Sequence, residues 1–109
     1  MANTFKLKTK ANVGVTTVGI YTAPAATTTV VIGITLANTS GSVVNVGVGI
    51  TRAGTTEDVK LLKNAPIPQG SSLEFMGGNK VVLEATDTVT VDSDTNNSVD
   101  ASLTIMEIT

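Results

Sequence analysis

The residues best suited to metal chemistry lie in one short acidic stretch, DSDTNNSVD. Asp92, Asp94 and Asn96 repeat the D-x-D-x-N spacing that opens a calcium-binding loop, in which side-chain oxygens surround a hard cation. The pattern then fails, because Asn97 stands where the loop needs glycine and Leu103 stands where a glutamate should complete the site. A non-helical calcium loop built from the same oxygens is the alternative. We expect a solvated hairpin tip here, and no metal.

A second cluster, FKLKTK, holds Lys6, Lys8 and Lys10 in alternation with smaller or apolar residues. In an extended segment this alternation places all three lysines on one side. One interpretation is an edge strand whose lysines discourage pairing with other sheets. The other is an N-terminal arm, residues 1–10, in which Phe5 and the lysines contact a negatively charged neighbour by adding a strand to its sheet.

The sequence offers little for catalysis. It contains no His and no Cys, which excludes Ser–His and Cys–His nucleophiles and thiolate metal sites. The S-x-x-K spacing of a Ser–Lys pair does not occur. Glu57 and Asp58 are adjacent, so in a strand their carboxylates would point to opposite faces rather than into one cleft. We therefore expect neither an enzyme nor a cofactor.

Composition also argues against several kinds of partner. Aromatic residues make up 3% of the chain and Trp is absent, which disfavours stacking on sugars or bases. The net charge is -2, divided into +4 before Glu57 and -6 from Glu57 onward, so nucleic acid is an unsuitable ligand. No apolar run reaches the length of a membrane span, and the charged start does not match a signal peptide. We expect no nucleic acid, membrane or small-molecule substrate, and synthesis in a cytoplasm.

The elements that position these residues are strands. Alternating apolar residues place Val44, Val46, Val48 and Ile50 on one face, and they do the same near the C-terminus. Thr and Val dominate, and both favour a pleated sheet. The predicted strands are 4–10, 17–22, 28–37, 43–52, 57–63, 72–76, 80–85, 87–92 and 98–108. This pattern predicts one all-β domain over residues 1–109, an antiparallel β-sandwich or jelly roll of eight or nine short strands without significant helix.

Turn residues separate the predicted strands. The segment ANTSGS, residues 37–42, supplies Asn and Gly for a tight reversal, so we expect a hairpin joining the strands on either side. Gly77, Gly78 and Asn79 predict a second hairpin turn. The two prolines of APIPQGSS predict an extended connection.

Several apolar residues face away from the core in the predicted register. They are Val31, Val43, Met106 and Ile108, together with one of Val81 and Val82. Scattered surface apolar residues are common in monomers, whereas a contiguous patch marks a subunit interface. The candidate interface residues are therefore Phe5, Lys6, Lys8, Lys10, Val31, Val43, Met106 and Ile108.

Three stretches carry a family resemblance. The segments IYTAPAATTTVVIGITLANTSGS, LLKNAPIPQGSSLEFMGGNKVVLEATDTVTV and VDASLTIMEIT resemble small virion structural proteins of tailed phages, including cyanophages. The resemblance extends from Val18 to Thr109 and rests on strand and turn patterns, not on reactive residues. It implies a β-sandwich component of a virion.

Within that family the chain is most similar in character to a head decoration, or cement, protein. The resemblance then implies a homo-oligomer, typically a trimer, that binds the major capsid protein and stabilises the capsid at the outer surface of the virion. A neck, tail or baseplate accessory protein is the first alternative. A receptor- or glycan-binding fibre module is the second, and the scarcity of aromatic residues counts against it.

Overall fold

The computed structural model describes residues 3–55, 57–74 and 80–109, and these residues form nine strands. No helix long and apolar enough to cross a membrane occurs among them. The strands are β1 (Asn3–Val13), β2 (Val18–Thr22), β3 (Thr28–Asn38), β4 (Val44–Arg52), β5 (Glu57–Ile67), β6 (Ser72–Glu74), β7 (Val81–Leu83), β8 (Thr88–Ser93) and β9 (Val99–Ile108). Within the described residues the predicted strands are confirmed, with ends that differ by a few positions.

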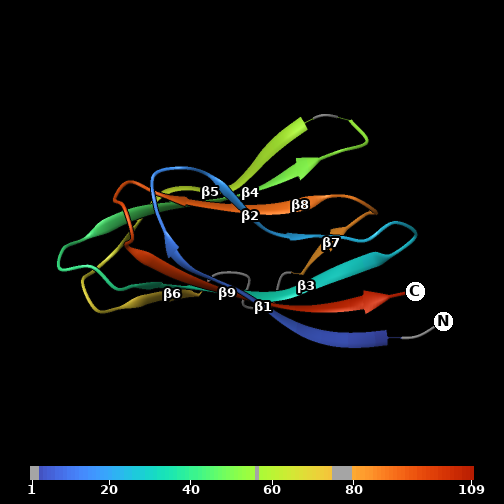
Figure 1. Ribbon diagram of the computed structural model, residues 1–109, viewed down its shortest axis with the longest axis horizontal. Helices are drawn as coiled ribbons and strands as arrows, with labels where there is room; N and C mark the ends of the chain where they lie inside the picture. The colour runs from blue at the N-terminus through green and yellow to red at the C-terminus, as the bar shows by residue number, and fades with distance from the viewer. Residues whose placement is uncertain (1–2, 56, 75–79) are drawn as a thin grey trace.

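The strands form two antiparallel sheets packed face to face (Figure 1). The five-stranded sheet has the order β1-β9-β3, with β6 and β7 both paired to β3 on its other side. The four-stranded sheet has the order β2-β8-β4-β5. Successive strands alternate between the sheets, except that β4 and β5 form a hairpin in the four-stranded sheet and that β6 and β7 both lie in the five-stranded sheet. This alternation is the jelly-roll arrangement, and it confirms the predicted fold class.

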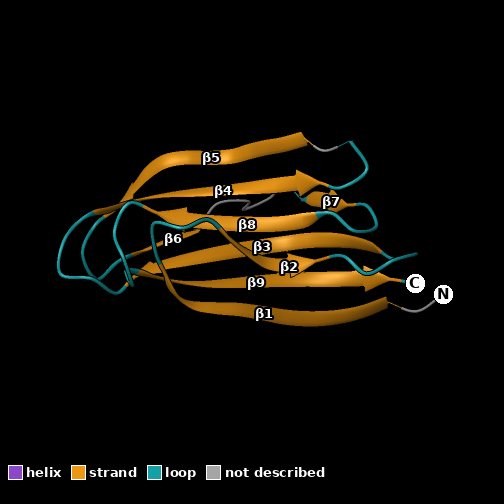
Figure 2. Cartoon of the chain, turned by 45° about the horizontal axis from the view of Figure 1, so that its top comes forward, coloured by secondary structure: helices purple, strands orange, loops and turns teal. Residues whose placement is uncertain are grey.

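The sandwich is elongated, with extents of 45 × 26 × 22 Å. Its strands run along the long axis, and β1 begins at the same end of the molecule at which β9 ends (Figure 2). The register explains this, because Asn3 on β1 pairs with Ile108 on β9. Here β1 forms one edge of the five-stranded sheet, while β5 forms one edge of the other.

Alternating side chains fill the space between the sheets. The predicted inward residues of β4 and β9 are all buried, as are Val89 and Val91 on β8. Burying a Val, Leu or Ile side chain contributes about 1.5–3 kcal/mol. The core residues with less than 2% exposure are Val13, Ile34, Leu36, Val44, Val46, Val48, Ile67, Leu83, Val91, Val99, Leu103 and Ile105.

The faces predicted for the start of β3 are wrong. Val31 was expected to face outward, but it is 3% exposed and belongs to the core. The cause is a β-bulge between Val31 and Gly33, where β3 shifts its register against β9. A bulge adds one residue to the strand and reverses the faces on one side of it. Val31 and Ile34 therefore share the inward face, while Val30 points outward.

The segment after β3 is a connection between sheets, not the expected hairpin. β3 belongs to the five-stranded sheet and β4 to the four-stranded sheet. The buried side chain of Asn38 fixes this connection. Its Nδ2 donates to the carbonyls of Ser42, at 2.8 Å, and Ile67, at 2.9 Å, while its Oδ1 accepts from the backbone N–H of Ser40 at 2.9 Å. The bond to Ile67 gives a buried backbone carbonyl a partner, and the other two hold the turn that follows β3.

The acidic segment between β8 and β9 also crosses between the sheets, so the hairpin prediction is wrong here too. Its buried serines hold it in shape. The hydroxyls of Ser93 and Ser98 lie 2.7 Å apart, and Ser98 donates to the Thr95 carbonyl at 2.6 Å. The predicted turn at residues 77–79 lies outside the described residues.

Candidate functional site

The acidic loop does not gather its oxygens around a common point. Asp92 accepts a hydrogen bond from the Thr17 hydroxyl at 3.0 Å. Asp94 accepts from the backbone N–H of Asn45 at 3.1 Å and from the Thr95 hydroxyl at 3.0 Å. These bonds hold the loop against neighbouring segments. In residues 3–55, 57–74 and 80–109, no group of three acidic, His or Cys side chains is arranged to hold a metal ion.

The Asn of the calcium-like motif, Asn96, is exposed on the same loop. Its Oδ1 lies near Gly14, where a Cβ would approach it to 3.2 Å. Asp92 lies on β8, Asp94 follows that strand, and Asn96 packs toward the start of the β1–β2 connection. The structure thus keeps the three oxygen donors of the motif in separate environments.

The lysine cluster lies on an edge strand, as the first interpretation of FKLKTK predicted. β1 pairs with β9 from Asn3 to Lys10. In this register Lys6, Lys8 and Lys10 stand opposite Ile105, Leu103 and Ala101, whose side chains face the core. The lysines therefore lie on the side of β1 that faces the second sheet.

Lys6 ends in a polar network that joins the two sheets. Its Nζ lies 2.9 Å from Oε1 of Glu107, a β9 residue that is 6% exposed. The other carboxylate oxygen, Oε2, accepts a hydrogen bond of 2.6 Å from the Tyr21 hydroxyl on β2. The Tyr21 oxygen also lies 2.8 Å from the Thr29 hydroxyl on β3. We name Lys6, Tyr21, Thr29 and Glu107 the sheet-bridging network.

The network shifts the titration of its acidic members. The hydrogen bond from Lys6, followed by that from Tyr21, holds the pKa of Glu107 below its ordinary value. Burial, together with the hydrogen bond to Glu107, raises the pKa of Tyr21 to about 12. Glu107 is thus held ionised and Tyr21 neutral across the physiological range. The two groups are hydrogen-bonded to each other, so their role is to link the two sheets.

A second ion-pair cluster links the end of β4 to the β7–β8 connection. Arg52, at the end of β4, contacts both Glu84 and Asp87. Its Nε lies 2.9 Å from Oδ2 of Asp87, whose side chain is 4% exposed. The same Oδ2 accepts the backbone N–H of Glu84 at 3.0 Å. This cluster fixes the segment that carries the chain from β7 to β8.

The outward face of the five-stranded sheet carries apolar side chains. In one row across four strands, Phe5 pairs with Met106, Met106 with Val30, and Val30 with Val82. Leu7 lies on the same face of β1, two residues from Phe5, and Ile108 lies two residues from Met106. We name these six residues the outer patch. Phe5, Leu7 and Val82 are 69%, 65% and 58% exposed.

The outer patch contains some of the predicted interface residues and omits others. Phe5, Met106 and Ile108 belong to it, and Val82 is the outward member of its pair, as predicted. Val43 is 59% exposed but precedes β4 at the opposite end of the sandwich. Leu7 and Val30 were missed. Alternation from Phe5 could have indicated Leu7, whereas Val30 depends on the bulge.

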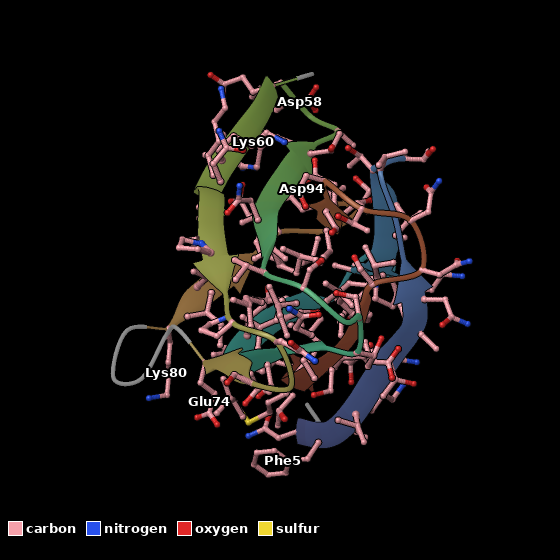
Figure 3. The ribbon with its side chains drawn as sticks, turned by 90° about the vertical axis from the view of Figure 1, so that its left-hand side faces the viewer. Phe5, Asp58, Lys60, Glu74, Lys80 and Asp94 are labelled. Carbon is pink, nitrogen blue, oxygen red and sulfur yellow. The ribbon has the colours of Figure 1, made fainter. Side chains whose placement is uncertain are left out.

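Two shallow hollows mark the sheet faces. The larger, of about 310 Å³, lies on the five-stranded sheet among residues such as Thr9, Thr35 and Asp100. The smaller, of about 220 Å³, lies on the four-stranded sheet, with Gly49 in its lining and the charged Asp58 and Lys60 beside it. Asp58 and Lys60 project on the side of the molecule opposite to Phe5 (Figure 3). Each lining mixes hydroxyl side chains with apolar and charged ones, which gives each hollow some hydrogen-bonding capacity.

The fold and its surfaces define a small all-β jelly roll whose exposed features are sheet faces and edges. No protein-family model matches the chain, and no curated protein matches it. Solved structures do share its fold.

One structural neighbour is a protein of Bacillus endospore appendages, described as a novel family of disulfide-linked pili. It has a TM-score of 0.58 and 16% identity, and the match covers 99% of this chain and 87% of that chain. Another comes from the T13 viral particle of IBDV, with a TM-score of 0.58 and 12% identity, covering 96% of this chain. This chain spans 30% of that longer viral chain. At these identities the likeness establishes a common fold.

Proposed function

We propose that this chain is a structural protein of a virus particle, acting as a capsid decoration protein. It would bind the major capsid protein at the outer head surface, in several copies, and stabilise the shell. The observation that carries the proposal is the jelly-roll likeness to a protein of the IBDV viral particle, which spans nearly the whole of this chain. The resemblance of its strand and turn segments to virion proteins of tailed phages supports the same class.

The physical character of the molecule suits this role. The sandwich is held by a continuous core and by polar links between its sheets, so docking orders few groups and costs little conformational entropy. Many identical weak contacts around a closed shell then add up through effective concentration. Under this proposal the exposed faces and edges are contact surfaces, and the chain performs no catalysis.

Copy number in the particle tests the proposal directly. We expect quantitative mass spectrometry of purified virions to find this chain in an amount comparable with the major capsid protein. A neck, tail or baseplate protein would be present at a small fraction of that amount, and a fibre-tip module would be scarcer still. Absence from purified particles would refute a virion role.

Charge-reversing substitutions on β1 test whether this strand contacts the capsid. They are preferable to deleting β1, because the deletion would remove a paired strand and expose β9. Lys8 and Lys10 lie on β1, and no ion pair with an acid is formed by either within the described chain. If they contact an acidic capsid surface, Lys8→Glu with Lys10→Glu weakens binding to heads that lack this protein, and the loss is smaller at high salt. The control is Lys63→Glu on the other sheet. Equal binding by both variants would count against β1 as the contact.

A subunit of a filamentous appendage is the second candidate. The pilus neighbour supports it, because that match covers most of both chains. The neighbouring pili are disulfide-linked, whereas this chain contains no cysteine and so any filament would need non-covalent contacts. Electron microscopy of the purified protein at high concentration separates the two, since filaments would favour the appendage and discrete particles the decoration protein.

A further inference from the structure

We propose that the outer patch is covered by the same patch of a second copy of this chain, in a face-to-face pair of five-stranded sheets. This inference concerns self-association and does not rest on the proposed function. A monomer would leave attachment to a virion open, and absence from virions would leave the pair intact.

The first argument is the size of the patch. Phe5, Leu7 and Val82 are each more than half exposed, and Val30, Met106 and Ile108 are half-buried beside them. Together they give an apolar surface on the order of 400 Å², which is the size of the largest such patch on a typical small protein, a patch that is often functional. A standard interface buries about 800 Å² per partner, so the patch supplies about half of one.

The second argument is the absence of charge. In the rows nearest the chain ends, the outward positions are Asn3, Thr28, Gly33 and Thr104 besides the patch residues themselves. None of these residues ionises, because the β1 lysines face the other side of the strand. Glu74 and Lys80 lie on the same side of the molecule as Phe5, toward the β6 and β7 margin (Figure 3). These uncharged rows can meet the same rows of a second copy without like-charge repulsion, as a two-fold interface requires.

The third argument is the lack of a complementary surface elsewhere. Among the described residues, the other large apolar side chains with high exposure are Val15, Val43 and Val59. They come from the β1–β2 connection, the β3–β4 connection and β5, so they form no second row. A head-to-tail contact would set the patch against a polar surface. Patch-to-patch contact buries the apolar groups of both copies.

Edge-to-edge association of β1 with β1 is disfavoured by its lysines. Antiparallel pairing of two such edges would set Lys6, Lys8 and Lys10 of one copy beside the same residues of the other, and facing like charges destabilise a strand pair. Face-to-face stacking keeps the lysines apart. A two-fold axis along the strands, between β9 and β3, would place Phe5 over Val82 of the second copy, and Met106 over Val30.

Sedimentation velocity over a wide range of concentration tests the pair. We expect the wild type to sediment as a dimer. We expect Phe5→Lys with Val82→Lys to raise the dissociation constant by roughly 30-fold or more, because each substitution replaces an exposed apolar anchor of the patch with a charge that the second copy would bury. The matched control is Val43→Lys, which introduces the same charge at a valine of equal exposure, 59% against 58%, and should leave the constant unchanged.

A wild-type monomer at all concentrations would overturn the inference, as would a trimer or an oligomer that survives the double substitution. Equal weakening by Val43→Lys would overturn it as well. Cross-linking provides a second measurement should the lysine variant fail to fold. The chain has no cysteine, so Phe5→Cys with Val82→Cys can be joined by a bis-maleimide with a reach of about 10 Å, the spacing of two packed sheets. We expect covalent dimers from this pair and none from Val43→Cys.

Discussion

The Tyr21 hydroxyl donates a 2.6 Å hydrogen bond to Oε2 of Glu107, and this bond joins β2 of one sheet to β9 of the other. The two residues are 86 positions apart in sequence. They meet because the jelly roll packs β2, in the four-stranded sheet, against β9, in the five-stranded sheet. Lys6 contacts the same carboxylate from β1. The end of the sandwich that carries both chain termini is therefore held by polar contacts as well as by apolar packing.

Removing the Tyr21 hydroxyl should destabilise the fold. Tyr21→Phe keeps the ring but leaves the buried oxygens of Glu107 and Thr29 with one partner fewer, which typically costs about 1–3 kcal/mol. Urea denaturation measures the change in the free energy of unfolding. The control is Thr22→Val, which removes an exposed hydroxyl bonded to Thr88 and should change stability by less than about 0.5 kcal/mol. Equal effects of both substitutions would argue against a structural role for the network.

Glu107 should make the fold sensitive to acid. Its pKa in the folded protein lies below the ordinary value of 4.5, because Lys6 and Tyr21 bond its ionised form. The resulting stabilisation is complete above pH 4.5 and is lost as the pH falls through the lower folded-state value. In denaturation measured as a function of pH, Glu107→Gln should therefore lose stability less steeply on acidification than the wild type. Glu57→Gln, an exposed change on β5, is the control and should keep the wild-type slope.

Tyr21 should make the fold sensitive to alkali. Its pKa is raised from 10.0 to about 12, chiefly by burial, so the unfolded chain ionises at a lower pH than the folded protein. This group's contribution is complete below pH 10.0 and is lost as the pH rises toward about 12. Absorbance of tyrosinate follows the titration directly, since Tyr21 is the single tyrosine of the chain. A folded-state midpoint near 10.0 would contradict the buried geometry.

How far the sequence predicts this structure depends on how each feature is encoded. Alternation in β4 and β9 is unambiguous, and the strands and core faces there follow from it. In TTTVVIGIT the neighbouring Val30, Val31 and Ile32 are all apolar, so the pattern does not decide which of them faces inward. The bulge settles that choice through pairing with β9, which no local pattern reveals.

The candidate surfaces show the same limit. Glu107 follows Val99, Ala101, Leu103 and Ile105 in steps of two, which places a carboxylate at an inward position and predicts a buried partner. That this partner is Tyr21 follows from the order of the strands, and the turn residues of the sequence do not predict that order. The hairpins predicted after β3 and β8 are wrong for the same reason, because Asn, Gly and Ser suit a crossing between sheets as well as a hairpin.

The ion pair between Arg52 and the buried Asp87 should contribute more to the stability of the fold than an exposed ion pair does. Arg52→Met keeps the apolar stem but leaves the carboxylate of Asp87, 4% exposed, without its cation. Breaking a fully buried pair costs about 3–5 kcal/mol, and we expect about 2 kcal/mol here because the arginine is 34% exposed. Lys60→Met, which removes an exposed contact of 4.0 Å to Asp92, should cost less than about 0.5 kcal/mol. Chemical denaturation of both variants makes the comparison.

Gly49 allows β4 and β5 to approach closely at a bulged part of their pairing. A Cβ at this position would lie 2.8 Å from the Val59 carbonyl oxygen and 3.2 Å from the Thr90 hydroxyl oxygen. The carbonyl belongs to the backbone of β5, so relief requires the strands to move apart, and overpacking of this kind costs about 1–3 kcal/mol. Gly33→Ala is the matched control, because a Cβ there meets no atom within 4 Å. Thermal unfolding should show Gly49→Ala melting well below the wild type and Gly33→Ala close to it. Equal melting temperatures for the two variants would mean that the β4–β5 contact yields without cost.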